Sequence, residues 1–343
     1  MRRGLASKFI FNKRDNVSKK IPLIIDVDTG IDDAFGLLYA LADPNVRLLG
    51  VSTVAGNVDL VRATENTRAV LALGGRIDIP VWPGAAAPLL KSARDASEIH
   101  GKSGLGDAEL EIPPPPAEPP AHAVDAILAA AKAHKGELIL VATGPLTNIA
   151  VALLRDPDLV RKMKRFVLMG GAFFEGGNVT PTAEFNIWHD PEAARIVFRA
   201  FGALGAAPLI AVGLDVTRKT LLLPADIEAL RPRLAGLPRG EQLVKFLADA
   251  SRHYLELMRS WGRAEAVVIH DPLAVAVALD PSFVTLAPAA VDVEILGELT
   301  RGMTVVHNRA DLAPRPNAQV AVGVAAPRFI AAYLEAMVRL AAA

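Results

Sequence analysis

Residues 21–38, IPLIIDVDTGIDDAFGLL, decide the fold of this chain. The first seven of them are mostly apolar and β-branched, which is typical of a buried strand in a parallel sheet. Thr29-Gly30 then permits a sharp turn, and residues 34–41 carry apolar side chains at the density of a helix. A buried strand that turns directly into a helix indicates an α/β fold.

Four carboxylates lie within eight residues of this stretch: Asp26, Asp28, Asp32 and Asp33. A capping box of Thr29 with Asp32 and the helix dipole explain the acids of the helix, but not the two that end a strand, where unpaired charge is expensive. Open α/β sheets bind ligands at this end of their strands. Oxygen donors without cysteine suit a hard cation, and Ca²⁺ accepts several carboxylates and carbonyls in flexible geometry. The stretch therefore predicts a calcium site.

The composition is that of a globular protein with a sizeable core. Hydrophobic residues make up 52% of the 343, charged residues 22%, and the net charge is zero, so nothing suggests a nucleic acid or an anionic membrane as a partner. The absence of cysteine excludes disulfides, thiolate metal sites and cysteine nucleophiles, and the cytoplasm is the default compartment. No uncharged apolar stretch is long enough to span a bilayer.

Residues 1–20 differ in composition from the rest. They hold seven lysines and arginines against the single acid Asp15, and no apolar run follows the first arginines, so a secretory signal is a poor fit. We expect a disordered basic extension, with an organelle-targeting peptide as the alternative. Residues 21–343 are expected to form one domain.

Strand and helix patterns alternate along that domain. Between residues 83 and 120 the pattern gives way to a loop, and residues 224–261 form an amphipathic helical cap beside the sheet. Strands are expected at 46–54, 79–82, 137–142, 165–169 and 208–216, and β-like runs at 291–296, 303–307 and 319–324. Helices are expected at 60–73, 122–134, 149–154, 273–279 and 327–340.

Polar residues follow several of these strands. Asn57 comes just after the second strand, and the Thr143-Gly144-Pro145 turn exposes carbonyls that a cation could use. His100, in a glycine-rich loop, suggests a mobile flap over a site, although a lone histidine in a loop is more often merely exposed. Asn178, Glu184 and Asn186 could hydrogen-bond a polyhydroxyl ligand. An His-Asp-Pro sequence occurs at residues 189–191 and again at 270–272, and helix capping explains both copies, so the residues alone do not show which is functional.

Six blocks, in order, resemble the nucleoside hydrolase family, of the inosine-uridine preferring nucleoside N-ribohydrolase type. The resemblance runs from about Pro22 to the C-terminus. The blocks are Asp26 to Asp33, Val54-Ala55-Gly56-Asn57, Ala142 to Asn148, Met169-Gly170-Gly171, Asn178 with Glu184-Phe185-Asn186, and His270-Asp271-Pro272-Leu273.

The resemblance implies a single α/β domain with a Rossmann-like, mostly parallel central sheet flanked by helices, and Ca²⁺-dependent hydrolysis of the N-glycosidic bond of a ribonucleoside. A homodimer or homotetramer is expected. The implied metal ligands are Asp28, Asp33, the carbonyl of Thr143, and Asp271. Asp28 would also be the general base toward a metal-bound water, and His270 the acid toward the leaving base. The remaining implied contacts are Asn57 to the water, Asp32 and Asn186 to the 2′- and 3′-hydroxyls, Asn178 and Glu184 to the 5′-hydroxyl, and Met169 to the ribose pocket.

The nucleobase is not specified. Contacts to it would come from the loop of His100 and from residues 224–266, where His253, Tyr254, Arg259 and Trp261 are candidates, so purine and pyrimidine stay open. Two other classes of protein are alternatives. A haloacid-dehalogenase-like phosphatase would use Asp26 and Asp28, and a non-catalytic protein would bind a ribonucleoside without cleaving it.

Overall fold

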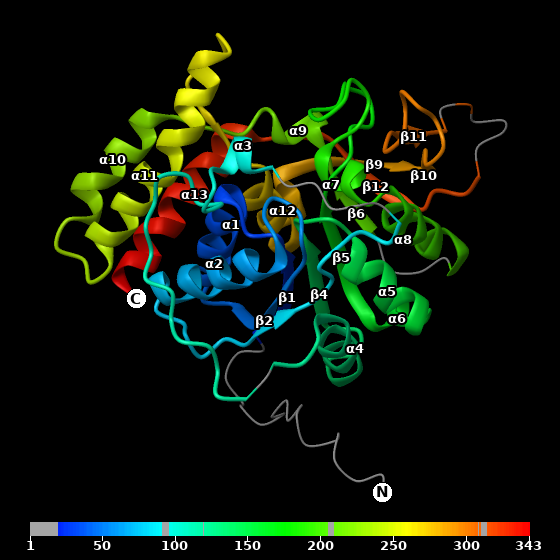
Figure 1. Ribbon diagram of the computed structural model, residues 1–343, viewed down its shortest axis with the longest axis horizontal. Coiled ribbons are helices and arrows are strands. Elements are labelled where there is room, and N and C mark those ends of the chain that lie inside the picture. Colours follow the sequence, from blue (N-terminus) through cyan, green and yellow to red (C-terminus); the bar gives the residue numbers. More distant parts are fainter. Residues whose placement is uncertain (1–19, 91–95, 119, 205–208, 308, 310–313) are drawn as a thin grey trace, which may run out of the picture.

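An eight-stranded sheet forms the centre of the computed structural model (Figure 1). The structure describes residues 20–90, 96–118, 120–204, 209–307, 309 and 314–343, so the basic extension expected at residues 1–20 lies outside the described residues except for Lys20. All neighbouring strands are parallel except the last pair. In spatial order the strands are β3 (Val81–Pro83), β2 (Val46–Thr53), β1 (Ile21–Val27), β4 (Leu138–Ala142), β5 (Met163–Met169), β6 (Leu209–Val212), β12 (Ala318–Val324) and β9 (Val284–Ala289).

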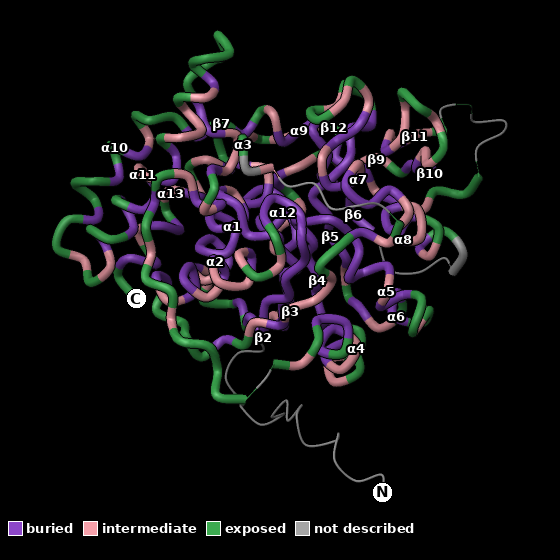
Figure 2. The backbone as a smooth tube through the Cα atoms, in the orientation of Figure 1, coloured by how far each residue is buried: buried purple, intermediate pink, exposed green. Residues whose placement is uncertain are grey.

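Alternate side chains of β1 enter two separate hydrophobic cores. Leu23, Ile25 and Val27 belong to one core, and Ile24 belongs to the other. Successive side chains of a strand point to opposite faces, so both faces of the sheet must be covered, as the continuous apolar run predicted. In Figure 2 the central strands β1, β4 and β5 are buried over most of their length.

Helices cover each face of the sheet (Figure 1). The face of Leu23 packs against α1 (Ile31–Leu41), α2 (Leu60–Leu73), α12 (His270–Leu279) and α13 (Ala326–Ala342). The face of Ile24 packs against α4 (Ala123–Ala133), α5 (Thr147–Arg155), α6 (Leu159–Lys162) and α8 (Pro191–Leu204). The predicted α/β fold, with a mostly parallel sheet flanked by helices, is confirmed.

The helical cap consists of α10 (Pro224–Leu234) and α11 (Gly240–Ser260), which lie beside α13 (Figure 1). Phe246 of α11 packs edge-on against Phe35 of α1, with ring centroids 6.0 Å apart, so the cap joins the core of the sheet domain. None of the helices in the described part of the chain is long and apolar enough to cross a membrane.

Some element boundaries differ from the sequence analysis. The strand expected at 208–216 stops at Val212, and the rest of that apolar run is the short helix α9 (Leu214–Thr217). Strand β9 was missed because Pro288 interrupts its pattern, which an antiparallel edge strand tolerates. The β-like runs expected at 291–296 and 303–307 are confirmed as the hairpin of β10 (Val291–Val293) with β11 (Thr304–Val306). Short elements that the analysis did not predict are α3 (Ser97–His100), α7 (Phe185–His189), and the pair β7 (Leu221–Leu222) with β8 (Val267–Val268).

Candidate active site

The candidate site lies at the carboxyl edge of the sheet, where three neighbouring strands end. Because β1, β2 and β4 are parallel, Asp28, Asn57 and Thr143 emerge at the same edge. Asp28 follows β1, and its Oδ2 accepts a hydrogen bond from the backbone N–H of Asn57 at 2.7 Å. Its Oδ1 accepts from Nδ2 of Asn57 at 3.2 Å. The side chain of Asp28 is therefore held at the edge by the loop that follows β2.

Four carboxylates converge at this edge. Oxygen atoms of Asp32, Asp33 and Asp271 lie within 4.8 Å of one another. Asp28 is within hydrogen-bond reach of Asp33, and Asp32 is within reach of Asp271. Asp32 and Asp33 come from the first turn of α1, whereas Asp271 comes from the first turn of α12, more than 230 residues later in the chain. The three-oxygen group includes Asp32, which the resemblance assigns to a hydroxyl rather than to the metal.

Asp33 is the acid most firmly fixed by hydrogen bonds. Its Oδ2 accepts from the N–H of Gly30 at 2.9 Å and from Nδ2 of Asn57 at 3.1 Å, and its Oδ1 accepts from the hydroxyl of Thr143 at 2.8 Å. The expected capping box of Thr29 with Asp32 is wrong, because the helix begins at Ile31 with Gly30 as its N-cap. Asp33, and not Asp32, therefore caps the N-terminus of α1.

Two glycines allow the loops to approach this closely. A Cβ at Gly56 would lie 2.0 Å from Oδ2 of Asp28, and a Cβ at Gly30 would lie 2.5 Å from Nδ1 of His100. Any side chain at either position would displace the neighbouring group. Gly56 therefore makes room for the carboxylate of Asp28, and Gly30 makes room for the ring of His100.

Burial and mutual repulsion make these acids hard to ionise. Burial, and then the charge of Asp33, raise the pKa of Asp28 well above its usual range and raise that of Asp32 to about 7. Burial, and then the charge of Asp32, raise the pKa of Asp271 well above its usual range. Such a cluster is stable either with shared protons or with a cation that compensates its charge.

The donor set fits a hard divalent cation. The four acids form no ion pair with a lysine or an arginine in the described part of the chain, so their charge has no protein counter-ion there. All the available donors are oxygens, which Ca²⁺ and Mg²⁺ prefer. The carbonyl of Thr143 accepts from Nδ2 of Asn186 at 2.7 Å and keeps a second lone pair for another partner.

Comparison with known proteins decides the family. The model of the family "inosine-uridine preferring nucleoside hydrolase" matches residues 23–331. The chain belongs to this family. The nucleoside hydrolases cleave the N-glycosidic bond of ribonucleosides, so the predicted family and enzyme class are confirmed, and the phosphatase alternative is excluded.

Several nucleoside hydrolases are similar to the chain over nearly its whole length. The inosine-uridine preferring nucleoside hydrolase of Leishmania major is 37% identical over 325 residues, which are 93% of this chain and 98% of that protein. The pyrimidine-specific ribonucleoside hydrolase RihA of an Enterobacter species is 38% identical, over 90% of this chain and 95% of that protein. The solved structure of the purine-preferring ribonucleoside hydrolase of Gardnerella vaginalis superposes with a TM-score of 0.84 at 36% identity, over 94% of this chain and 99% of that one. Relatives named for different bases are thus about equally similar.

Polar residues of the segment after β5 face the same edge. Asn186 donates from Nδ2 to the carbonyls of Thr143 and Met169, at 2.7 and 3.2 Å, so it is placed between the ends of β4 and β5. Buried Glu184 caps α7, accepting from the N–H groups of Gly171, Asn186 and Ile187 at 2.9 to 3.2 Å. These backbone contacts engage both carboxylate oxygens of Glu184.

Asn178 is more remote from the acids. Its side chain is exposed, and its Oδ1 accepts from the N–H of Phe185 at 2.9 Å. The contact connects the loop before α7 to the segment that carries Glu184 and Asn186. Asn178 therefore reaches the candidate site through a loop, whereas the other predicted residues lie at strand and helix ends.

Two histidines border the acid cluster. Nδ1 of His100 accepts from the N–H of Ile31 at 3.1 Å, which places the glycine-rich loop over the start of α1. His270 begins α12, and its Nδ1 lies 2.7 Å from the hydroxyl of Thr217 in α9. Burial lowers the pKa of His100 to about 4 and that of His270 to about 3, so both rings are neutral at pH 7. The sequence analysis missed Thr217, because nothing along the chain connects it with a residue 53 positions later.

Two further aspartates have structural partners. Asp26 points to the opposite face from its strand neighbours, and its Oδ1 accepts from Ser52 at 2.5 Å and from Asn148 at 2.9 Å. Burial raises the pKa of Asp26 to about 7. Asp190, the acid of the first His-Asp-Pro copy, accepts from the N–H of Ala193 at 3.0 Å as the cap of α8, whereas Asp271 of the second copy lies in the acid cluster.

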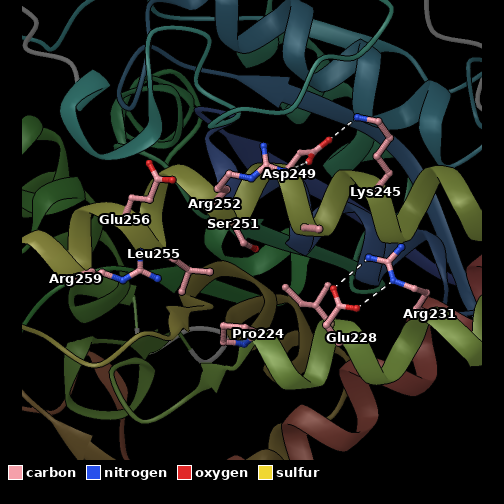
Figure 3. Close-up of a pocket in the computed structure, with 12 residues that line it drawn as sticks. Pro224, Glu228, Arg231, Lys245, Asp249, Ser251, Arg252, Leu255, Glu256 and Arg259 are labelled. Atoms are coloured by element: carbon pink, nitrogen blue, oxygen red, sulfur yellow. Dashed lines mark hydrogen bonds and ion pairs between the residues drawn. The ribbon is translucent and has the colours of Figure 1, made fainter.

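The cap carries a separate pocket of about 420 Å³ between α10 and α11 (Figure 3). Ion pairs within each helix line it, Glu228 with Arg231 on α10 at 3.1 Å and Lys245 with Asp249 on α11 at 2.5 Å, and none of the clustered acids lines it. Among the candidate contacts to the nucleobase, Arg259 lines this pocket. Tyr254 lies near Asp32 instead. Burial, and then the charge of Asp32, raise the pKa of the Tyr254 phenol to about 12. Trp261 is 48% exposed.

Proposed function

We propose that this nucleoside hydrolase uses one Ca²⁺ at the carboxyl edge of the sheet, held by Asp28, Asp33, Asp271 and the carbonyl of Thr143. The observation that carries the proposal is that carboxylate oxygens of Asp32, Asp33 and Asp271 lie within 4.8 Å of one another, with Asp28 within hydrogen-bond reach of Asp33. None of these acids is paired with a lysine or an arginine among the described residues. A cation in such a site fixes a sugar diol and lowers the pKa of a water molecule.

Asp28 acts as the general base in this proposal. It takes a proton from the water that attacks C1′ of the ribose, while the bond from C1′ to the nitrogen of the base breaks. The hydrogen bonds from Asn57 to both oxygens of Asp28 support this role, because they fix the direction in which the carboxylate can accept a proton.

The other residues bind and orient the ribose. Asp32 and Asn186 accept the 2′- and 3′-hydroxyls, Glu184 and Asn178 hold the 5′-hydroxyl, and Met169 lines the ring. Oxygens arranged around the sugar stabilise the positive charge that develops as the glycosidic bond breaks. The position of Asn186 between β4 and β5 supports its role, since its Nδ2 faces the backbone and its Oδ1 is the atom left for a hydroxyl.

His270 assists departure of the base, and His100 closes over the substrate. Because the ring of His270 is neutral at pH 7, it assists by donating a neutral N–H hydrogen bond to the leaving base. The substrate range covers both purine and pyrimidine ribonucleosides, and the enzyme is a homodimer or homotetramer.

Turnover tests the proposal directly. The protein is incubated with inosine, uridine, cytidine and p-nitrophenyl riboside, with and without EDTA, and the release of free base or nitrophenol is measured. We expect hydrolysis that EDTA abolishes and Ca²⁺ restores. Unchanged activity after exhaustive chelation would refute the metal site, and tight binding of inosine without any release of base would support the non-catalytic alternative. Sedimentation velocity gives the number of subunits.

A further inference from the structure

We propose that Thr217 is a positioning residue for His270: its hydroxyl donates to Nδ1 and thereby holds the ring in the tautomer whose Nε2 carries the proton. The inference rests on the proposed role of His270 and assigns a function to a residue outside the family motifs.

The contact between the two side chains is short, and the threonine side of it is fully buried. Oγ1 of Thr217 lies 2.7 Å from Nδ1 of His270, and Thr217 has no exposed surface. Imidazole has one protonated and one unprotonated nitrogen when neutral, so the partner of Nδ1 decides which proton the ring presents at Nε2. The distance therefore makes Thr217 the residue that selects the tautomer.

The direction of the hydrogen bond follows from the hydroxyl's own needs. A buried hydroxyl must donate its proton to an acceptor, and Nδ1 of His270 is the acceptor recorded for Thr217 in the described part of the chain. If Nδ1 carried the proton instead, the hydroxyl proton of Thr217 would have to be buried without this acceptor. Donation from Thr217 to Nδ1 leaves Nε2 protonated, which is the form that can donate to a leaving base.

The backbone fixes the two side chains relative to each other. Ile269, the residue before His270, donates its N–H to the carbonyl of Thr220 at 3.0 Å. The hydroxyl of Thr220 in turn donates to the carbonyl of Thr217 at 2.7 Å and lies 3.2 Å from that of Ile269. The turn after α9 is thus joined to the start of α12 at the position where Thr217 meets His270.

A second anchor holds the other side of α9. The guanidinium of Arg218 donates to the carbonyls of Gly176 and Gly177, at 2.9 and 2.6 Å, in the loop before α7. Because α9 is held both at the start of α12 and at the loop before α7, Thr217 cannot move to follow a rotation of the His270 ring. The site therefore favours one ring orientation before substrate arrives, which is the value of a preorganised donor.

Three variants test the inference. Thr217→Val removes the hydroxyl at nearly equal volume, Thr217→Ser restores it, and Thr220→Val disturbs the same turn without touching the ring. We expect Thr217→Val to lower kcat/KM for inosine about tenfold, with less than about a threefold loss on p-nitrophenyl riboside, whose leaving group needs no proton. Thr217→Ser should recover most of the activity, and Thr220→Val should change the two substrates alike.

A measurement without substrate separates this inference from the proposed function. Nitrogen-15 NMR of the histidine rings, assigned with His270→Ala, reports which nitrogen is protonated. We expect Nε2–H in the wild type and a loss of that preference in Thr217→Val. An Nδ1–H ring in the wild type, or equal losses on both substrates in Thr217→Val, would overturn the inference. Absence of nucleoside turnover in the wild type would instead refute the proposed function and leave the tautomer result standing.

Discussion

Cation binding should release protons, and the number follows from the geometry of the acid cluster. Asp28 is within hydrogen-bond reach of Asp33, and Asp32 is within reach of Asp271. Two carboxylates at this distance share a proton rather than ionise together. A cation held by Asp28, Asp33 and Asp271 engages both pairs and must displace about two protons. Each displaced proton changes the apparent Kd tenfold per pH unit, so affinity should rise about a hundredfold per unit, or roughly 2.7 kcal/mol.

The pH range is set by the raised pKa values. The ordinary pKa of these acids is 3.8, and that of Asp32 in the folded protein is about 7, so the dependence should be steep from about pH 5 to pH 6.5. Calorimetric titration with Ca²⁺ in buffers of different ionisation enthalpy counts the released protons directly. Asp33→Asn should bind Ca²⁺ at least tenfold more weakly and release fewer protons. A Kd that stays constant over this range, with no proton release, would refute the reasoning.

Three further predictions concern single side chains. Asp28→Ala should lower hydrolysis at least a hundredfold, while the thermal midpoint in EDTA is maintained; full activity would remove Asp28 from the mechanism. His270→Ala should slow inosine far more than p-nitrophenyl riboside, and equal losses would reassign the residue to structure. Asp26→Asn should stabilise the EDTA-treated protein relative to the wild type, increasingly as pH rises from 4 to 7. Over this range Asp26 ionises in the unfolded chain but keeps its proton in the folded one, because its pKa is raised there, so the wild type loses stability. The difference between the ordinary pKa of 3.8 and the folded pKa of about 7 corresponds to at most roughly 4 kcal/mol of unfolding free energy. Urea unfolding at each pH measures the effect, and a gain in stability that does not change with pH would contradict the prediction.

The sheet and the site edge were predictable because they depend on local patterns. The apolar run of β1 and the turn at Gly30 specify a buried strand that enters a helix, and parallel strands bring their carboxyl ends together. Asn57 and Thr143 could be placed at the same edge from the ends of their strands alone. The helical cap was recognisable from its amphipathic pattern.

Features that depend on tertiary packing were not predictable. Asp26 and Asp28 are two residues apart in the same acidic motif, yet Asp26 lies inside β1 and meets Ser52 and Asn148, whereas Asp28 follows the end of the strand. The sequence did not show at which of the two acids the strand ends. The pairing of Thr217 with His270 arises only where α9 packs beside α12, and no periodicity encodes it.

The glycine at position 56 has a consequence for anyone who reads or redesigns sequences of this kind. Even a single methyl group there would collide with Oδ2 of Asp28 at 2.0 Å. A homologue that retains every acid but carries alanine at this position would look intact in a motif search and still be an inert pseudoenzyme. Libraries aimed at new nucleosides should therefore leave this glycine untouched and vary the helices of the cap instead.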